Sequence, residues 1–138
     1  MQPSTATPQA SNVGLYLLKL SFTPKVLGGG SMTLALTVNA VSGTLHGQAQ
    51  GKLQEGTKNP STFTADASGV LHSTGFGPNV KVGSVRGQAF VSFPPPAIGS
   101  YLAPFSASFS LDADGKGTGQ FSVGHNTYAD CVVSIETR

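Results

Sequence analysis

The chain alternates apolar and polar residues over much of its length, and this period predicts β-strands. In "MTLALTVNAV", which begins at Met32, every second residue is apolar as far as Val38, and "FSASFSL" from Phe105 repeats the same order. Strict alternation over such lengths is typical of a strand with one buried face. Apolar residues nowhere recur at three-four spacing through a stretch of helical length. The pattern therefore predicts an all-β protein.

About eight or nine strand candidates follow one another at roughly ten-residue intervals, the spacing of a sandwich or barrel. They cover residues 13–22, 32–41, 44–54, 61–69, 70–76, 80–93, 105–111, 118–123 and 128–137. The sequences "LGGGS" from Leu27 and "DADGKG" from Asp112 are typical turns between them. We predict a single domain over residues 13–138, either an antiparallel β-sandwich or a flattened barrel. Residues 1–12 contain two prolines and no periodicity, and they are expected to form a disordered tail.

One short sequence is nearly repeated. "GTLHGQAQG" starts at Gly43, "GSVRGQAFV" starts at Gly83, and "GKGTGQF" from Gly115 is a weaker echo. In the first two copies glycine and alanine share a face with the aliphatic residues. Glycine weakens a strand, so its use there indicates a bend, a bulge or a close backbone approach. We interpret the copies as equivalent positions in a curled sheet, because a phosphate-binding glycine loop needs a strand–turn–helix context.

Composition and charge narrow the possible partners. Only 10% of the 138 residues are charged, the net charge is +2, and the eight basic residues are scattered singly. Nucleic-acid binding needs clustered basic groups, so it is not expected. The N-terminus lacks the basic start and apolar stretch of a signal peptide, and no run approaches the ~20 apolar residues of a membrane helix. We expect a cytoplasmic protein without a membrane span, and export by a signal-independent route stays open.

The residues that could bind a metal do not have the required spacing. Asp112, Asp114 and Gly117 match the first half of an EF-hand calcium loop. Lys116 then occupies a ligand position, and Val123 stands where the closing glutamate belongs. A turn built from aspartate and glycine is the simpler interpretation. The three histidines, His46, His72 and His125, lie far apart in the sequence. No metal and no cofactor are therefore expected.

Catalytic residues are equally scarce. Cys131 is the only cysteine, which excludes an internal disulfide, and it lies in an apolar strand candidate where free cysteine usually packs as a small hydrophobe. The chain has no Gly-x-Ser-x-Gly nucleophile elbow and only six acidic residues. We expect the protein not to be an enzyme.

The segment "FPPPAIGSYLAPF", from Phe93 to Phe105, is the main candidate for a binding site. Three consecutive prolines favour an extended conformation, and a long loop without regular structure is often functional. Pro95, Ile98, Tyr101 and Leu102 are the candidate binding residues. The alternative is a lid that covers core residues at an open end of the sheet.

The strands that begin "MTLALTVNAVSGTLHGQAQG" and "PNVKVGSVRGQAFVSF", with the later "FSLDADGKGTGQFSV", resemble a family of small bacterial proteins named DUF1842, a domain of unknown function. The resemblance covers roughly Val13 to Val123. It rests on the strand pattern, the first hairpin and the Pro-Asn sequence before the long strand. It implies a bacterial origin and a compact β domain, and it supplies no active-site residues.

These observations favour a non-enzymatic binding protein that uses the segment Phe93–Phe105 or an adjacent sheet edge. The polar faces of the strands are rich in Ser, Thr and Gln and nearly uncharged, so an unknown protein or a neutral ligand is the expected partner. The alternative is a small barrel that carries an apolar ligand inside, since an eight-stranded barrel can hold one.

Overall fold

The computed structural model describes residues 14–25, 30–53, 61–73, 81–93 and 98–136, and it confirms an all-β fold. In chain order the strands are β1 (Leu15–Pro24), β2 (Ser31–Asn39), β3 (Thr44–Leu53), β4 (Ser61–Ser73), β5 (Lys81–Ser92), β6 (Ser100–Leu111), β7 (Lys116–Val123) and β8 (Asn126–Ile135). Each strand pairs antiparallel with its neighbours in sequence. Since β8 also pairs with β1, the sheet closes into an eight-stranded barrel.

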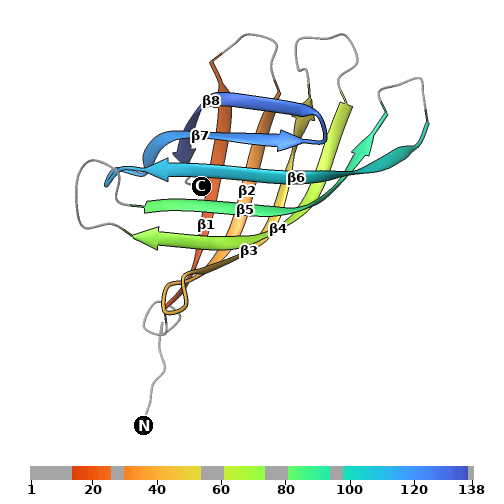
Figure 1. The fold of residues 1–138 in the computed structure, drawn as a ribbon. Coiled ribbons are helices and arrows are strands. Elements are labelled where there is room, and N and C mark those ends of the chain that lie inside the picture. The colour runs from red at the N-terminus through yellow and green to blue at the C-terminus, as the bar shows by residue number, and fades with distance from the viewer. Residues whose placement is uncertain (1–13, 26–29, 54–60, 74–80, 94–97, 137–138) are drawn as a thin grey trace.

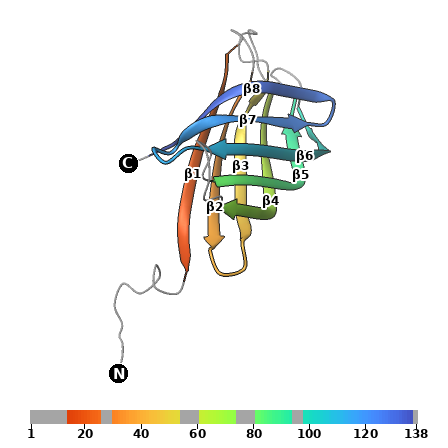
Figure 2. The ribbon, with the colours of Figure 1, turned by 60° about the vertical axis from the view of Figure 1, so that its left-hand side comes forward.

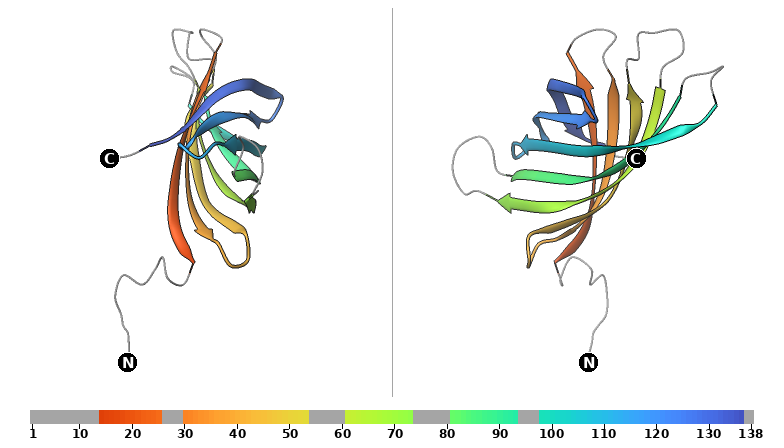
Figure 3. Two further views of the ribbon diagram at one scale, coloured as in Figure 1. Left: turned by 90° about the vertical axis from the view of Figure 1, so that its left-hand side faces the viewer. Right: turned by 45° about the vertical axis from the view of Figure 1, so that its right-hand side comes forward.

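The barrel is flattened into two layers. In Figure 1, β1 and β2 run steeply behind β6, β7 and β8, which cross them in front. Strands β3, β4 and β5 change direction along their length, and Figures 2 and 3 show the same bend from other sides. Strands that bend at the corners are how crossed layers stay in one continuous sheet. Of the two predicted architectures, the structure therefore has the flattened barrel.

The two Gly-Gln-Ala copies lie on β3 and β5, on either side of β4. In the β3–β4 register, Gln48 is opposite Asp66. The β4–β5 pairing stops after Ala65 and Ala89, skips two residues on each strand, and resumes at Ser68 and Arg86 in the same register. The backbone N–H of Gln88 donates instead to Asp66 Oδ1 at 2.9 Å. The two copies of the repeat therefore have a structural role: they lie on the two strands that flank the bend of β4.

The glycines of these copies are required by close backbone contact. A Cβ at Gly47 would overlap the carbonyl of Ala35, and a Cβ at Gly87 would overlap the carbonyl of Asp66. Neither glycine has a positive φ, so the requirement is space and not backbone conformation. The prediction of a curled sheet with close backbone approach is confirmed.

Aromatic rings fill the middle of the barrel. Phe121 lies 6.0 Å from Phe22, 6.2 Å from Phe63 and 4.9 Å from Tyr128, measured between ring centroids. The ring of Phe105 adds to this cluster through Phe63. No polar or charged residue is buried among the described residues. The core is therefore made of apolar side chains from both layers.

The structure corrects several predicted boundaries. Residues 61–73 form one strand, β4, where the sequence suggested two, so the described residues form eight strands. Strand β8 starts at Asn126 and contains a bulge opposite β7, with Asp130 at a φ of 55°. Aspartate tolerates this left-handed conformation better than most residues. Such local irregularities follow from the pairing of strands, which periodicity alone does not specify.

Candidate binding surface

The segment predicted as a loop is mostly strand. Residues 100–105 belong to β6, where Tyr101 pairs with Val91 and Leu102 pairs with Phe90. The backbone N–H of Phe93 donates to the carbonyl of Gly99 at 3.0 Å, which extends the β5–β6 hairpin by one more pair. The expectation of a long irregular loop was therefore wrong for residues 100–105. The apolar residues that follow the prolines pair with β5 and continue β6.

Three of the four predicted site residues are exposed on this hairpin. Ile98 is 97% exposed and Leu102 is 54% exposed, and Tyr101 is nearly half exposed. Pro95 lies outside the described residues. A lid would bury these side chains against the core, so their exposure contradicts the capping alternative for these three residues.

Two further aromatic residues are exposed on the same hairpin, one on each of its faces. Phe90 is 57% exposed and lies opposite Leu102 on the outer face of the hairpin. Phe93 is also exposed, and its ring centroid is 5.4 Å from that of Tyr101 on the other face. We call these five residues (Phe90, Phe93, Ile98, Tyr101 and Leu102) the apolar hairpin. The sequence indicated that Phe90 is unusual, because it is an apolar residue on the polar face of its strand.

One side of the hairpin pairs with no strand among the residues that the structure describes. Pairing of β6 with β7 begins at Phe105, and the last bond beyond it runs from the Gly124 N–H to the Pro104 carbonyl at 2.8 Å. Proline has no N–H to continue the ladder. Alternate residues of a strand direct their backbone N–H and C=O groups to the same side. The Pro104 carbonyl faces β7, so the backbone groups of Leu102 and Ser100 also point away from β5. We call the backbone of Ser100–Ala103 on this side the open edge.

The hairpin itself carries no charged residue near its exposed apolar side chains. The described stretches 87–93 and 98–111 contain no Asp, Glu, Lys or Arg. The single ion pair within the described ranges, Lys19 with Glu136 at 3.5 Å, belongs to β1 and the end of β8. The Asp66 carboxylate of β4 lines one pocket together with Phe90, but the hairpin itself offers a strongly charged partner no counter-charge.

The predicted turn at Asp112 is confirmed. Its Oδ1 accepts hydrogen bonds from the backbone N–H of Asp114 at 2.9 Å and of Lys116 at 3.0 Å. The carboxylate therefore holds the β6–β7 turn. Across the part of the chain that the structure describes, no three His, Cys, Asp or Glu side chains gather in a way that would hold a metal ion.

Cys131 is buried, as its apolar surroundings predicted. Its Sγ lies 3.4 Å from the carbonyl of Tyr128, as donor to that oxygen. Burial, together with the charge of Asp130, raises the pKa of the Cys131 thiol from 9.0 to about 11. A thiol that is protonated and shielded in this way is a poor nucleophile.

The fold and surface define a class: a small antiparallel barrel with a filled core and an exposed apolar hairpin. The model of one family, the domain of unknown function DUF1842, matches residues 13–128, and the chain belongs to that family. No curated protein matched the sequence. Within the described ranges, no helix has the length and apolar character needed to cross a membrane.

Proposed function

We propose that this protein is a non-enzymatic binding protein and that the apolar hairpin is its contact surface. The observation that carries the proposal is the exposure of five large apolar side chains on one hairpin, with Ile98 almost fully exposed. Phe90 and Leu102 form an exposed apolar group on one face of the hairpin, and Phe93 and Tyr101 form another on the opposite face. Grouped apolar side chains at a surface typically mark an interaction site. The scarcity of activated nucleophiles described above supports a role in binding.

The open edge suggests how the partner binds. An unpaired strand edge can accept an extended segment of another protein, whose backbone continues the ladder while its alternate side chains fit the flanking surface. Here the backbone groups of Ser100 and Leu102 are available for pairing, and Tyr101 and Leu102 project from the two faces of the strand. We infer an uncharged, extended peptide segment with alternating apolar residues as the partner.

Interior carriage of an apolar ligand has less support. The rings of Phe22, Phe63, Phe105 and Phe121 are each at most 2% exposed and lie within contact distance of one another in pairs. A ligand in the middle of the barrel would have to displace them, and core side chains are close-packed.

The test is selection of peptides on the immobilised full-length protein from a displayed library. Selected sequences are expected to alternate apolar residues and to contain few charges. Replacing Tyr101 and Leu102 by Ser should weaken a selected peptide by tenfold or more, because buried apolar area supplies most of the binding energy. Val82→Ser is the matched control, since Val82 is an exposed strand residue elsewhere on β5. Equal affinity of the hairpin variant and the control would contradict the proposal.

Amide hydrogen exchange tests the mode of binding. The N–H of Leu102 faces the open edge, whereas that of Tyr101 faces β5. Addition of a strand should slow exchange at Leu102 and leave Tyr101 unchanged. Peptide binding without protection of the Leu102 amide would exclude strand addition and leave contact through side chains only.

A further inference from the structure

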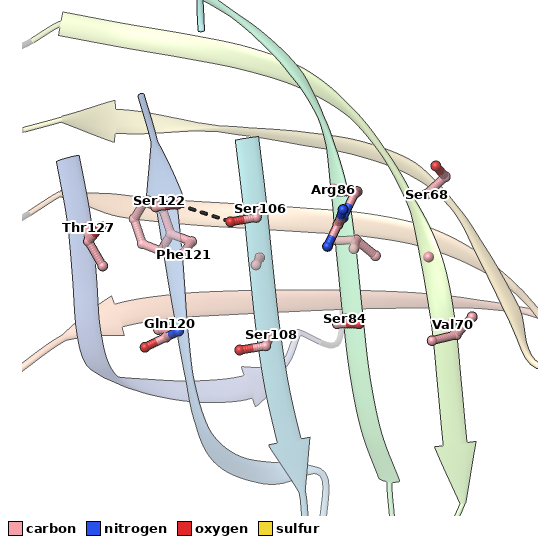
Figure 4. Close-up of a pocket in the computed structure, with 13 residues that line it drawn as sticks. Ser68, Val70, Ser84, Arg86, Ser106, Ser108, Gln120, Phe121, Ser122 and Thr127 are labelled. Atoms are coloured by element: carbon pink, nitrogen blue, oxygen red, sulfur yellow. Dashed lines mark hydrogen bonds between the residues drawn. The ribbon is translucent and has the colours of Figure 1, made fainter. Parts of the chain in front are cut away.

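A second surface, separate from the apolar hairpin, lies on the outside of the barrel. Here the outer faces of β4 to β8 form a hollow of about 650 Å³, within the range of small-molecule binding sites (Figure 4). Its side chains are mostly hydroxyls: Ser68, Ser84, Ser106, Ser108, Ser122 and Thr127, with Gln120, Arg86 and Val70. We call it the hydroxyl hollow.

The hollow depends on the glycine pattern of the sheet. Gly69 lies in its wall, and a Cβ there would overlap the backbone carbonyl of Ser84 on the next strand. At the neighbouring bend, Gly87 approaches the carbonyl of Asp66 in the same way. These contacts allow β4 and β5 to coil strongly, so the outer face of the barrel is concave where a barrel surface is usually convex.

Of the described residues that line the hollow, Arg86 alone is charged. It lies opposite Ser68 on β4 and Ser106 on β6, so hydroxyl groups flank it on both sides (Figure 4). Ser106 is itself hydrogen-bonded to Ser122 at 3.0 Å. Arg86 forms no ion pair with any described residue. The Asp66 carboxylate nearby accepts a bond from the Gln88 N–H and does not line the hollow.

We propose that the hydroxyl hollow binds a saccharide that carries a carboxylate, such as a uronic acid unit. The guanidinium of Arg86 binds the carboxylate, because its planar donors match the two oxygens. The serine hydroxyls and Gln120 donate to and accept from the sugar hydroxyls. Val70, which is partly exposed, contacts a C–H face of the ring.

Other ligand classes fit the hollow less well. An apolar ligand would cover many hydroxyls without giving them hydrogen-bond partners, which is unfavourable. A nucleic acid presents a row of phosphates, and a single arginine neutralises only one. A saccharide with one negative group satisfies both the hydroxyls and the single positive charge.

Titration calorimetry on the full-length protein tests this assignment, with methyl α-galacturonide, which carries one carboxylate, as the acidic probe and methyl α-galactoside as its neutral counterpart. The acidic sugar is expected to bind at least about tenfold more tightly than the neutral one, since a hydrogen bond to a charged group has that value or more. Amide NMR shifts should concentrate on the residues of β4 to β8 that line the hollow. Arg86→Gln should raise the Kd by about tenfold or more. Lys52→Gln, which removes one positive charge from the outer face of β3, should leave it unchanged.

Several results would overturn the proposal: no binding of either sugar at millimolar concentration, an equal loss in the Lys52 variant, or NMR shifts outside the hollow. Displacement of methyl α-galacturonide by an equal concentration of acetate would reduce the site to a simple anion site and refute the saccharide assignment. The Tyr101→Ser and Leu102→Ser changes should not alter sugar binding. The two proposals therefore succeed or fail independently.

Discussion

The close backbone contact at Gly87 predicts a large loss of stability on adding a single methyl group. In Gly87→Ala, the new Cβ would overlap the Asp66 carbonyl oxygen and lie 2.8 Å from the carbonyl carbon. These are backbone atoms of a paired strand, so β4 and β5 must separate locally. At Gly83 on the same strand, a Cβ would meet the ring of Phe109, nearest at 2.5 Å. The Phe109 ring can tilt to make room for a Cβ at Gly83, whereas the backbone of β4 cannot shift as easily for a Cβ at Gly87.

The expected magnitude follows from three contributions. Overpacking costs about 1–3 kcal/mol, and loss of the Gln88 N–H bond to Asp66 Oδ1 or of a ladder bond flanking the gap adds about 1 kcal/mol each. The reduced entropy of the unfolded chain offsets roughly 0.4–1 kcal/mol. Gly87→Ala should therefore destabilise the fold by about 3 kcal/mol, whereas Gly83→Ala should cost about 1 kcal/mol or less.

Thermal and urea unfolding followed by circular dichroism provide the assay. A loss of about 3 kcal/mol corresponds to a fall in Tm of roughly 10 °C for a domain of this size. A Tm within about 2 °C of the wild type for Gly87→Ala would refute the reasoning. So would equal losses in the two variants, because backbone and side-chain contacts would then be equivalent.

Two more predictions concern the core. Phe121→Ala removes the ring that contacts Phe22, Phe63 and Tyr128, and it should cost about 3–5 kcal/mol in urea unfolding, against a much smaller loss for Phe121→Leu. For Cys131, the pKa is raised in the folded state from 9.0 to about 11, so the folded protein retains a proton that the unfolded chain releases. The thiol's contribution to stability is full below pH 9.0 and is lost as the pH rises toward about 11. The decline should be smaller in Cys131→Ala, and identical pH profiles would contradict it.

Much of the candidate binding surface could be predicted, and the missing part depends on strand pairing. The apolar residues after the three prolines identified Ile98, Tyr101 and Leu102, all of which are exposed. Sequence alone placed them in a loop, because prolines and glycines there obscure the alternation. Phe90 joins them only through its pairing with Leu102, across the hairpin.

The hydroxyl hollow was not predicted. Its serines and threonine come from β4, β5, β6, β7 and β8, and each lies on the ordinary polar face of its strand. No spacing along the chain distinguishes Ser84 or Ser106 from serines elsewhere. The barrel register brings them beside Arg86, so only the fold makes them one surface.

The sequence by itself determined the class of fold, because a period of two requires each strand to bury one face, and the repeated glycines marked where the sheet curls. Only the tertiary structure decided whether the sheet closes into a barrel. It also decided which part of β6 has no neighbouring described strand and which outer residues share a concave surface. The reason is physical: alternation is a local property of one strand, whereas closure, open edges and hollows depend on the register and coiling between strands distant in sequence.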